Sequence, residues 1–155
     1  MRVAIIGQGY VGLTIAVGAA GAGHEVTGFD VNAELVNQLN AGVSHIEGIS
    51  NLALKSFLST DKYSASADAS VINGCDVVVI AVPTPLTEGR EPDLSFVHAA
   101  ADLIAKNAKS AALVINESTS YPGTLRTYIK PTIEKYSKAK LTHEYAISPE
   151  LQASW

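Results

Sequence analysis

A glycine-rich turn near the start of the chain limits its possible folds more than any other feature. The apolar run at residues 3–6 leads directly into Gly7, Gly9 and Gly12, which stand in the spacing G-x-G-x-x-G. Because glycine lowers the stability of strands and helices, three of them in close succession need a reason. One reason is a phosphate group that must approach the backbone closely. The other is a tight strand-to-helix turn that binds nothing.

Short apolar runs alternate along the chain with longer segments of helical periodicity. Such alternation predicts parallel strands, because a parallel crossover needs a helix, and helices on both faces of the sheet. We therefore expect an α/β fold of the Rossmann type, a doubly wound parallel sheet in one domain. The expected strands are residues 2–6, 24–30, 63–66, 75–82, 111–119 and 141–148, and the expected helices are 10–22, 32–42, 52–58, 93–108 and 123–136.

The glycine-rich turn falls at the edge of such a sheet where ligands bind, beyond the carboxyl ends of the strands. Asp30 ends the next expected strand, which completes the fingerprint of dinucleotide binding. Gly7 then makes the turn, Gly9 admits the pyrophosphate, and Gly12 lets the helix pack on the strand. Asp30 would accept hydrogen bonds from the adenosine ribose and repel a 2′-phosphate, which favours NAD over NADP. Its alternative role is a cap on the following helix.

Two further polar motifs follow expected strands and so fall at the same edge. In AVPTPL at 81–86, the prolines turn the chain out of the sheet and Thr84 offers a hydroxyl to the crevice. In NESTSYPGT at 116–124, residues 117–119 place three oxygen-bearing side chains where a nicotinamide would lie. Thr119 would hold a water or a substrate oxygen there. For both motifs the alternative is a rigid loop or a helix cap with no ligand.

Other reactive residues are weaker candidates. The ISPE motif offers Glu150 as a carboxylate for proton transfer. Cys75 stands at the amino end of its strand, away from the ligand edge, so we expect a buried structural thiol. We expect packing roles for Tyr10, Tyr121 and Tyr128, with a ligand contact as the alternative for Tyr10 and Tyr121, which flank glycine motifs, and Tyr10 is a candidate cofactor contact. The histidines have no paired spacing or companion cysteines, so we expect no metal site.

Composition limits the possible partners. The 155 residues are 47% hydrophobic, which suffices for one sizeable core. The formal net charge of −4 and the lack of a Lys or Arg run argue against nucleic acid and an anionic membrane surface. One cysteine fits a reducing cytosol, and no run approaches the roughly 20 apolar residues of a membrane span. We expect a soluble cytoplasmic domain.

Together, these motifs resemble the amino-terminal domain of the nucleotide-sugar dehydrogenases, which are the UDP-glucose and UDP-N-acetylhexosamine 6-dehydrogenases. The resemblance extends over essentially the whole chain, through IIGQGYVGL, GFDVN, VPTPL, EPDLS, ESTSYPGT and SPE. It implies that Val11, Asp30, Thr84 and Thr119 contact NAD. It also implies that Thr119 and Glu150 help to order a water used in hydrolysis.

The same resemblance implies an activity that needs further residues. Such enzymes oxidise the C6 alcohol of a UDP-sugar to a carboxylate by two hydride transfers, consuming two NAD. Their nucleophilic cysteine and their lysine would lie beyond position 155. The resemblance thus implies that residues 1–155 are the NAD-binding first domain of a longer homo-oligomeric enzyme of surface polysaccharide precursor synthesis, and are inactive alone.

Within the family, the motifs ESTSYPGT and REPDLS favour the UDP-N-acetylhexosamine branch over the UDP-glucose branch. Two features depart from the family pattern. Leu35 stands where the family usually carries Lys or Arg near the adenosine. Residues 151–155, LQASW, match neither usual continuation after Glu150, so we expect them to be non-native or locally rearranged.

Two alternative functions stay open from the sequence. An NAD-dependent hydroxyacid or hydroxyacyl-CoA dehydrogenase would share the glycine fingerprint but not the paired VPTP and EST motifs. A non-catalytic dinucleotide sensor would need the glycine turn and Asp30, but not Thr119 or Glu150.

Overall fold

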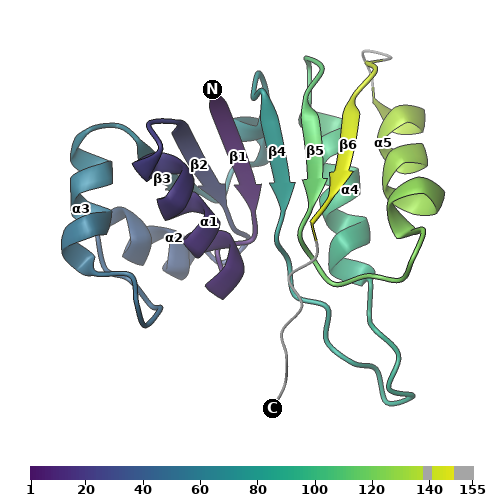
Figure 1. Ribbon diagram of the computed structural model, residues 1–155, viewed down its shortest axis with the longest axis horizontal. Helices are drawn as coiled ribbons and strands as arrows, with labels where there is room; N and C mark the ends of the chain where they lie inside the picture. Colours follow the sequence, from purple (N-terminus) through teal and green to yellow (C-terminus); the bar gives the residue numbers. More distant parts are fainter. Residues whose placement is uncertain (138–140, 149–155) are drawn as a thin grey trace.

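The computed structural model describes residues 1–137 and 141–148. Its strands are β1 (Arg2–Ile6), β2 (Glu25–Phe29), β3 (Tyr63–Ser66), β4 (Val77–Ile80), β5 (Leu113–Asn116) and β6 (Glu144–Ile147). They form one six-stranded sheet in the order β3-β2-β1-β4-β5-β6, and every neighbouring pair is parallel (Figure 1). The order reverses between β1 and β4. The expected doubly wound α/β sheet is confirmed.

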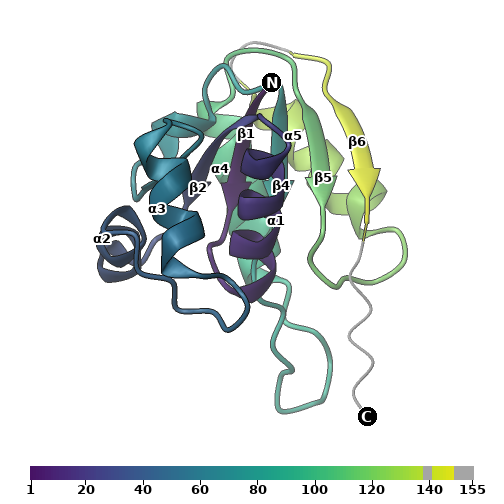
Figure 2. The same ribbon diagram turned by 60° about the vertical axis from the view of Figure 1, so that its left-hand side comes forward.

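Helices cover both faces of this sheet (Figures 1 and 2). They are α1 (Tyr10–Gly21), α2 (Ala33–Asn40), α3 (Asn51–Ser59), α4 (Ser95–Asn107) and α5 (Lys130–Tyr136), with a 3-10 turn η1 (Ala69–Ile72) and a π-helical turn η2 (Leu125–Ile129). Buried residues of α1, α2 and α3 pack on one face, and those of η1, α4, η2 and α5 pack on the other. None of the helices in the described part of the chain has both the length and the apolar character for a membrane span.

Alternate residues of β1 point into two separate cores. Val3 and Ile5 pack with α1, α2 and α3, whereas Ala4 and Ile6 pack with α4 and α5. All four side chains are buried. A strand with helices on both faces needs apolar residues at every position, which explains the unbroken apolar run.

The helix ends follow local chemistry, with two differences from expectation. Asn32, the first residue of the helix expected at 32–42, is the N-cap of α2. The helix expected from residue 93 is α4, whose cap residue is Leu94, although the Asp93 carboxylate accepts a hydrogen bond from the Ser95 N–H at 2.9 Å. The helix expected at 123–136 begins as the π-helical turn η2, because Pro131 has no N–H to continue the α-helical ladder.

Candidate functional site

The glycine-rich turn joins β1 to α1 at the carboxyl edge of the sheet, where the strand order reverses. Gly7 has φ of +91°, and a Cβ there would lie 2.5 Å from the Ala81 carbonyl oxygen. A Cβ on Gly12 would overlap the carbonyl oxygen of Gly7. The fold itself therefore requires glycine at both positions.

Gly9 differs from the other two glycines. It has φ of −69°, and a Cβ on it would meet no atom of the described residues within 4 Å. Gly9 is the N-cap of α1 and supplies no side-chain cap. The first N–H groups of a helix attract anions, and here open space lies beside them. The position fits a pyrophosphate lying against the backbone, which a larger side chain at Gly9 would displace.

Asp30 lies directly after β2, beside the glycine-rich turn. One carboxylate oxygen accepts a hydrogen bond from the Gln8 N–H at 2.8 Å, and the other accepts from the Asn32 N–H at 2.9 Å. The cap of α2 is Asn32, whose side chain accepts from the N–H groups of Glu34 and Leu35. Asp30 is therefore not the N-cap of α2, and two backbone groups fix the direction of its half-buried carboxylate.

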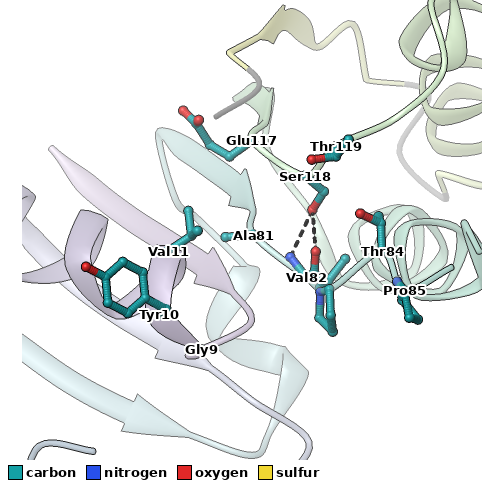
Figure 3. Close-up of a pocket in the computed structure, with 11 residues that line it drawn as sticks. Gly9, Tyr10, Val11, Ala81, Val82, Thr84, Pro85, Glu117, Ser118 and Thr119 are labelled. Atoms are coloured by element: carbon teal, nitrogen blue, oxygen red, sulfur yellow. Dashed lines mark hydrogen bonds between the residues drawn. The ribbon is translucent and has the colours of Figure 1, made fainter. Parts of the chain in front are cut away.

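Two adjoining hollows meet at Gly9 and the segment 81–83. The first contains Asp30 and is otherwise mainly apolar, with Leu35 and Phe96 among its lining residues. The second lies over the ends of β4 and β5, and its lining residues are mixed in polarity (Figure 3). They include Tyr10, Val11, Thr84, Glu117, Ser118 and Thr119. Two hollows joined at a helix N-terminus suit a ligand with two ends and an anionic centre.

Neither hollow is lined by a lysine or arginine from the described part of the chain. Leu35 stands where the family usually has Lys or Arg, so the hollow around Asp30 has no cation among its described lining residues. A 2′-phosphate there would face the Asp30 carboxylate without a cation to compensate for the repulsion.

Ser118 holds two loops of the site together. Its side chain is 5% exposed. The hydroxyl accepts a hydrogen bond from the Val82 N–H at 2.9 Å and donates to the Val82 carbonyl at 2.8 Å (Figure 3). Behind it, the buried Asn116 amide donates to the Ser118 carbonyl at 2.9 Å. Sequence reasoning grouped Ser118 with the ligand-facing oxygens, but its hydroxyl is engaged in this contact.

The comparison with known families decides the identity of the domain. Residues 1–154 match the UDP-glucose/GDP-mannose dehydrogenase family, NAD binding domain. The chain belongs to this family. The match covers the whole described fold. It decides for this family and against the hydroxyacid and hydroxyacyl-CoA dehydrogenases considered from the sequence.

Relatives of this NAD-binding domain are longer proteins. UDP-N-acetyl-D-mannosamine dehydrogenase of Pyrococcus horikoshii is 40% identical over 125 residues, covering 80% of this chain and 30% of the relative. UDP-N-acetyl-D-glucosamine 6-dehydrogenase of Pseudomonas aeruginosa is 33% identical, covering 97% and 35%. A solved UDP-glucose dehydrogenase of Pyrobaculum islandicum has a TM-score of 0.88 and 33% identity, covering 97% and 36%. The chain spans about a third of the length of these proteins.

Cys75 lies before β4, at the opposite edge of the NAD-binding domain from the hollows. It is buried, its thiol donates a hydrogen bond to the Val71 carbonyl at 3.2 Å, and burial raises its pKa. The expected structural thiol is confirmed. In the described residues, no three His, Cys, Asp or Glu side chains are grouped to hold a metal ion.

The tyrosines do not share one role. Tyr10 is 60% exposed and lines the second hollow, and Tyr121 is 43% exposed, so neither is a core residue, and the alternative of a ligand contact stays a prediction for both. Tyr128 stacks on His98 with ring centroids 3.5 Å apart.

Glu150, like residues 151–155, lies outside the described residues, so its expected role stays a prediction.

Sequence reasoning also missed the role of Gln8, the residue between the first two glycines. Its side chain is fully buried and its backbone N–H contacts Asp30. The available signal was Gly28, because an isolated glycine inside a strand marks the close approach of another group.

Proposed function

We propose that this NAD-binding domain serves a UDP-sugar 6-dehydrogenase, which oxidises the C6 alcohol of a UDP-N-acetylhexosamine to the acid. The observation that carries the proposal is the pair of hollows joined at Gly9, with Asp30 in one hollow and Thr84 and Thr119 beside the other. This arrangement matches the two halves of NAD and the pyrophosphate between them.

The hollow around Asp30 would receive the adenosine half. The carboxylate, oriented by the N–H groups of Gln8 and Asn32, still has lone pairs to accept hydrogen bonds from ribose hydroxyls. Leu35 and Phe96 offer apolar surface to the adenine ring. The N–H groups at the start of α1, beside Gly9, would bind the pyrophosphate.

The second hollow would receive the nicotinamide, which accepts hydride from the sugar when NAD is bound. Val11 and the hydroxyls of Thr84 and Thr119 would orient the ring from three different loops or helix starts. Thr119, together with Glu150, is our candidate for ordering the water that takes part in hydrolysis. The nucleophilic cysteine and the lysine would come from other parts of the enzyme.

Relatives support the choice of substrate class. The two curated relatives described above are dehydrogenases of UDP-N-acetyl sugars, and the structural relative is a UDP-glucose dehydrogenase. We assign this chain to the N-acetylhexosamine branch, as the first domain of a cytoplasmic homo-oligomeric enzyme that makes surface polysaccharide precursors. Because the relatives include both UDP-N-acetyl-sugar and UDP-glucose dehydrogenases, the branch is tested by comparing the rates at which the complete enzyme oxidises the different UDP-sugars.

Cofactor titration tests the proposed site in the chain itself. NAD and NADP are titrated by calorimetry into the wild type, Asp30→Ala and the control Glu25→Ala, which alters an exposed carboxylate at the other end of β2. We expect NAD to bind the wild type far more tightly than NADP. Asp30→Ala should weaken NAD binding by about 1–3 kcal/mol, since charge-assisted hydrogen bonds are lost, and Glu25→Ala should not. Equal affinities for NAD in all three proteins would refute the ribose assignment.

A further inference from the structure

The Gln8 side chain extends from the glycine-rich turn past Gly28 to Tyr63 and lines neither of the two hollows. The side chain is fully buried and makes three hydrogen bonds. Its Nε2 donates to the carbonyls of Ile5 at 3.1 Å and Gly7 at 3.0 Å. Its Oε1 accepts from the hydroxyl of Tyr63 at 2.9 Å. Both amide protons and one amide lone pair are therefore used.

The direction of the Gln8 amide follows from its partners. The carbonyls of Ile5 and Gly7 can only accept, so the NH₂ end must face them, and the oxygen faces Tyr63. Tyr63 is 2% exposed, and burial together with the charge of Asp30 raises the pKa of its hydroxyl. The hydroxyl therefore stays protonated and able to donate at neutral pH.

Gly28 makes the room for this contact. It lies in β2, and a Cβ on it would overlap the amide group of Gln8. The Gln8 side chain thus reaches across β2 from the turn after β1 to Tyr63 on β3. The amide thus bonds to Ile5 of β1 and to Tyr63, the first residue of β3, and passes over Gly28 of β2.

The same residue also contacts Asp30 through its backbone. The Gln8 N–H donates to the Asp30 carboxylate at 2.8 Å, so the peptide that orients the carboxylate is itself held by the buried amide. A rotation of this peptide would turn Asp30 and would also move Gly9, the next residue in the turn. The orientation of Asp30 and the shape of the turn are therefore coupled through Gln8.

We propose that Gln8 and Tyr63 form a buried positioning pair, which holds the glycine-rich turn and the Asp30 carboxylate in the geometry that binds the adenosine ribose. Neither residue lines the hollows, so the pair acts on NAD only through Asp30 and the turn. The inference rests on the proposed function, specifically on ribose binding by Asp30. A purely structural pair would support the fold alone and would leave the NAD affinity of the folded protein unchanged.

A double-mutant cycle on the 155-residue chain separates the two roles. Tyr63→Phe removes one hydroxyl, and Gln8→Met keeps a similar length without the amide. The matched control is Tyr145→Phe on β6, which removes another buried hydroxyl at the far edge of the sheet. NAD affinity is measured by calorimetry at a temperature where thermal melts show each variant to be folded.

We expect Tyr63→Phe to weaken NAD binding roughly three- to tenfold, and Gln8→Met by at least as much, because a buried hydrogen bond is lost at each position. Tyr145→Phe should leave the affinity unchanged. In an Asp30→Ala background, the loss caused by Tyr63→Phe should be clearly smaller, since the part that passes through the Asp30 carboxylate is gone and only the part through the turn remains. If Gln8→Met does not fold, the NAD affinity of Tyr63→Phe, measured with and without Asp30→Ala, decides between the two roles.

Three results would overturn the inference in different ways. Unchanged affinity in folded Tyr63→Phe would leave the pair a purely structural role. An equal loss with and without the Asp30 carboxylate would show that the effect does not pass through Asp30. Normal NAD affinity in Asp30→Ala would instead refute the proposed ribose contact, and the positioning role with it.

Discussion

A single hydroxyl, that of Ser118, makes two hydrogen bonds with one residue of the neighbouring loop, Val82. It accepts from the Val82 N–H at 2.9 Å and donates to the Val82 carbonyl at 2.8 Å. Ser118 follows β5 and Val82 follows β4, so the contact joins the loops that carry Thr119 and Thr84. The relative position of these two threonines therefore depends on a side chain that is itself buried.

Ser118→Ala should loosen both loops. It leaves the half-buried Val82 N–H without its partner, so we expect the free energy of unfolding to fall by about 1–3 kcal/mol. NAD affinity should fall as well, because the loop bearing Thr84 loses its anchor. Urea denaturation and NAD titration measure the two effects, with the exposed Ser64→Ala on β3 as control. Wild-type values for both quantities would show that the Ser118–Val82 contact contributes neither to stability nor to NAD binding.

Gly9→Val and Gly12→Val should impair the domain in different ways, the first by loss of NAD binding and the second by loss of stability. A side chain at Gly9 meets no described protein atom, so Gly9→Val should fold normally and lose detectable NAD binding. A side chain at Gly12 overlaps the Gly7 carbonyl, so Gly12→Val should lower the free energy of unfolding by about 1–3 kcal/mol or more. Thermal melts and calorimetry distinguish the two. NAD binding by folded Gly9→Val would place the pyrophosphate elsewhere.

His143 should make the stability of the fold depend on pH. It is buried, and its Nδ1 accepts a hydrogen bond from the Ala112 N–H at 3.2 Å. Burial lowers the pKa of His143 below its ordinary value of 6.5, against the opposing charge of Glu134. Below about pH 6.5 the unfolded chain therefore binds the proton more readily than the folded chain.

This contribution to stability is complete above the pKa of the unfolded histidine and is lost as pH falls through the lower pKa of the folded one. We expect the melting temperature to fall between pH 7 and about pH 5. His143→Gln, which keeps an acceptor for Ala112, should reduce this slope, whereas the exposed control His45→Gln should not. Parallel slopes for wild type and His143→Gln would contradict the assignment.

Cys75 should be dispensable for cofactor binding. Its thiol is buried and its pKa is raised, so it is a poor nucleophile, and Cys75→Ser should bind NAD as the wild type does. The 155-residue chain with NAD and UDP-N-acetylglucosamine, UDP-N-acetylmannosamine or UDP-glucose should produce no NADH by absorbance. Production abolished by Cys75→Ser would make this thiol the nucleophile. Production that survives the substitution would show a self-sufficient enzyme of another kind.

Much of the fold was predictable because its signals are local. The strand at 2–6 was predicted to the residue, since a strand buried on both faces leaves an unbroken apolar run before the turn residues. The edge strand at 63–66, whose side chains alternate between buried and more exposed, was also predicted at its observed bounds. Asp30 and the three glycines were predicted at the ligand edge, because their spacing reports on one strand, one turn and one helix. The π-helical turn at η2 was not predicted, although Pro131 was its signal.

The sequence by itself thus determined the parallel α/β sheet, the glycine-rich turn and the family, all of which depend on patterns within short segments. Only the tertiary structure decided that Gln8 bonds to Tyr63 and that Ser118 bonds to Val82. Each of these pairs joins residues far apart in the chain. The sheet brings them together by placing strand ends side by side, and no local periodicity encodes which side chains then meet.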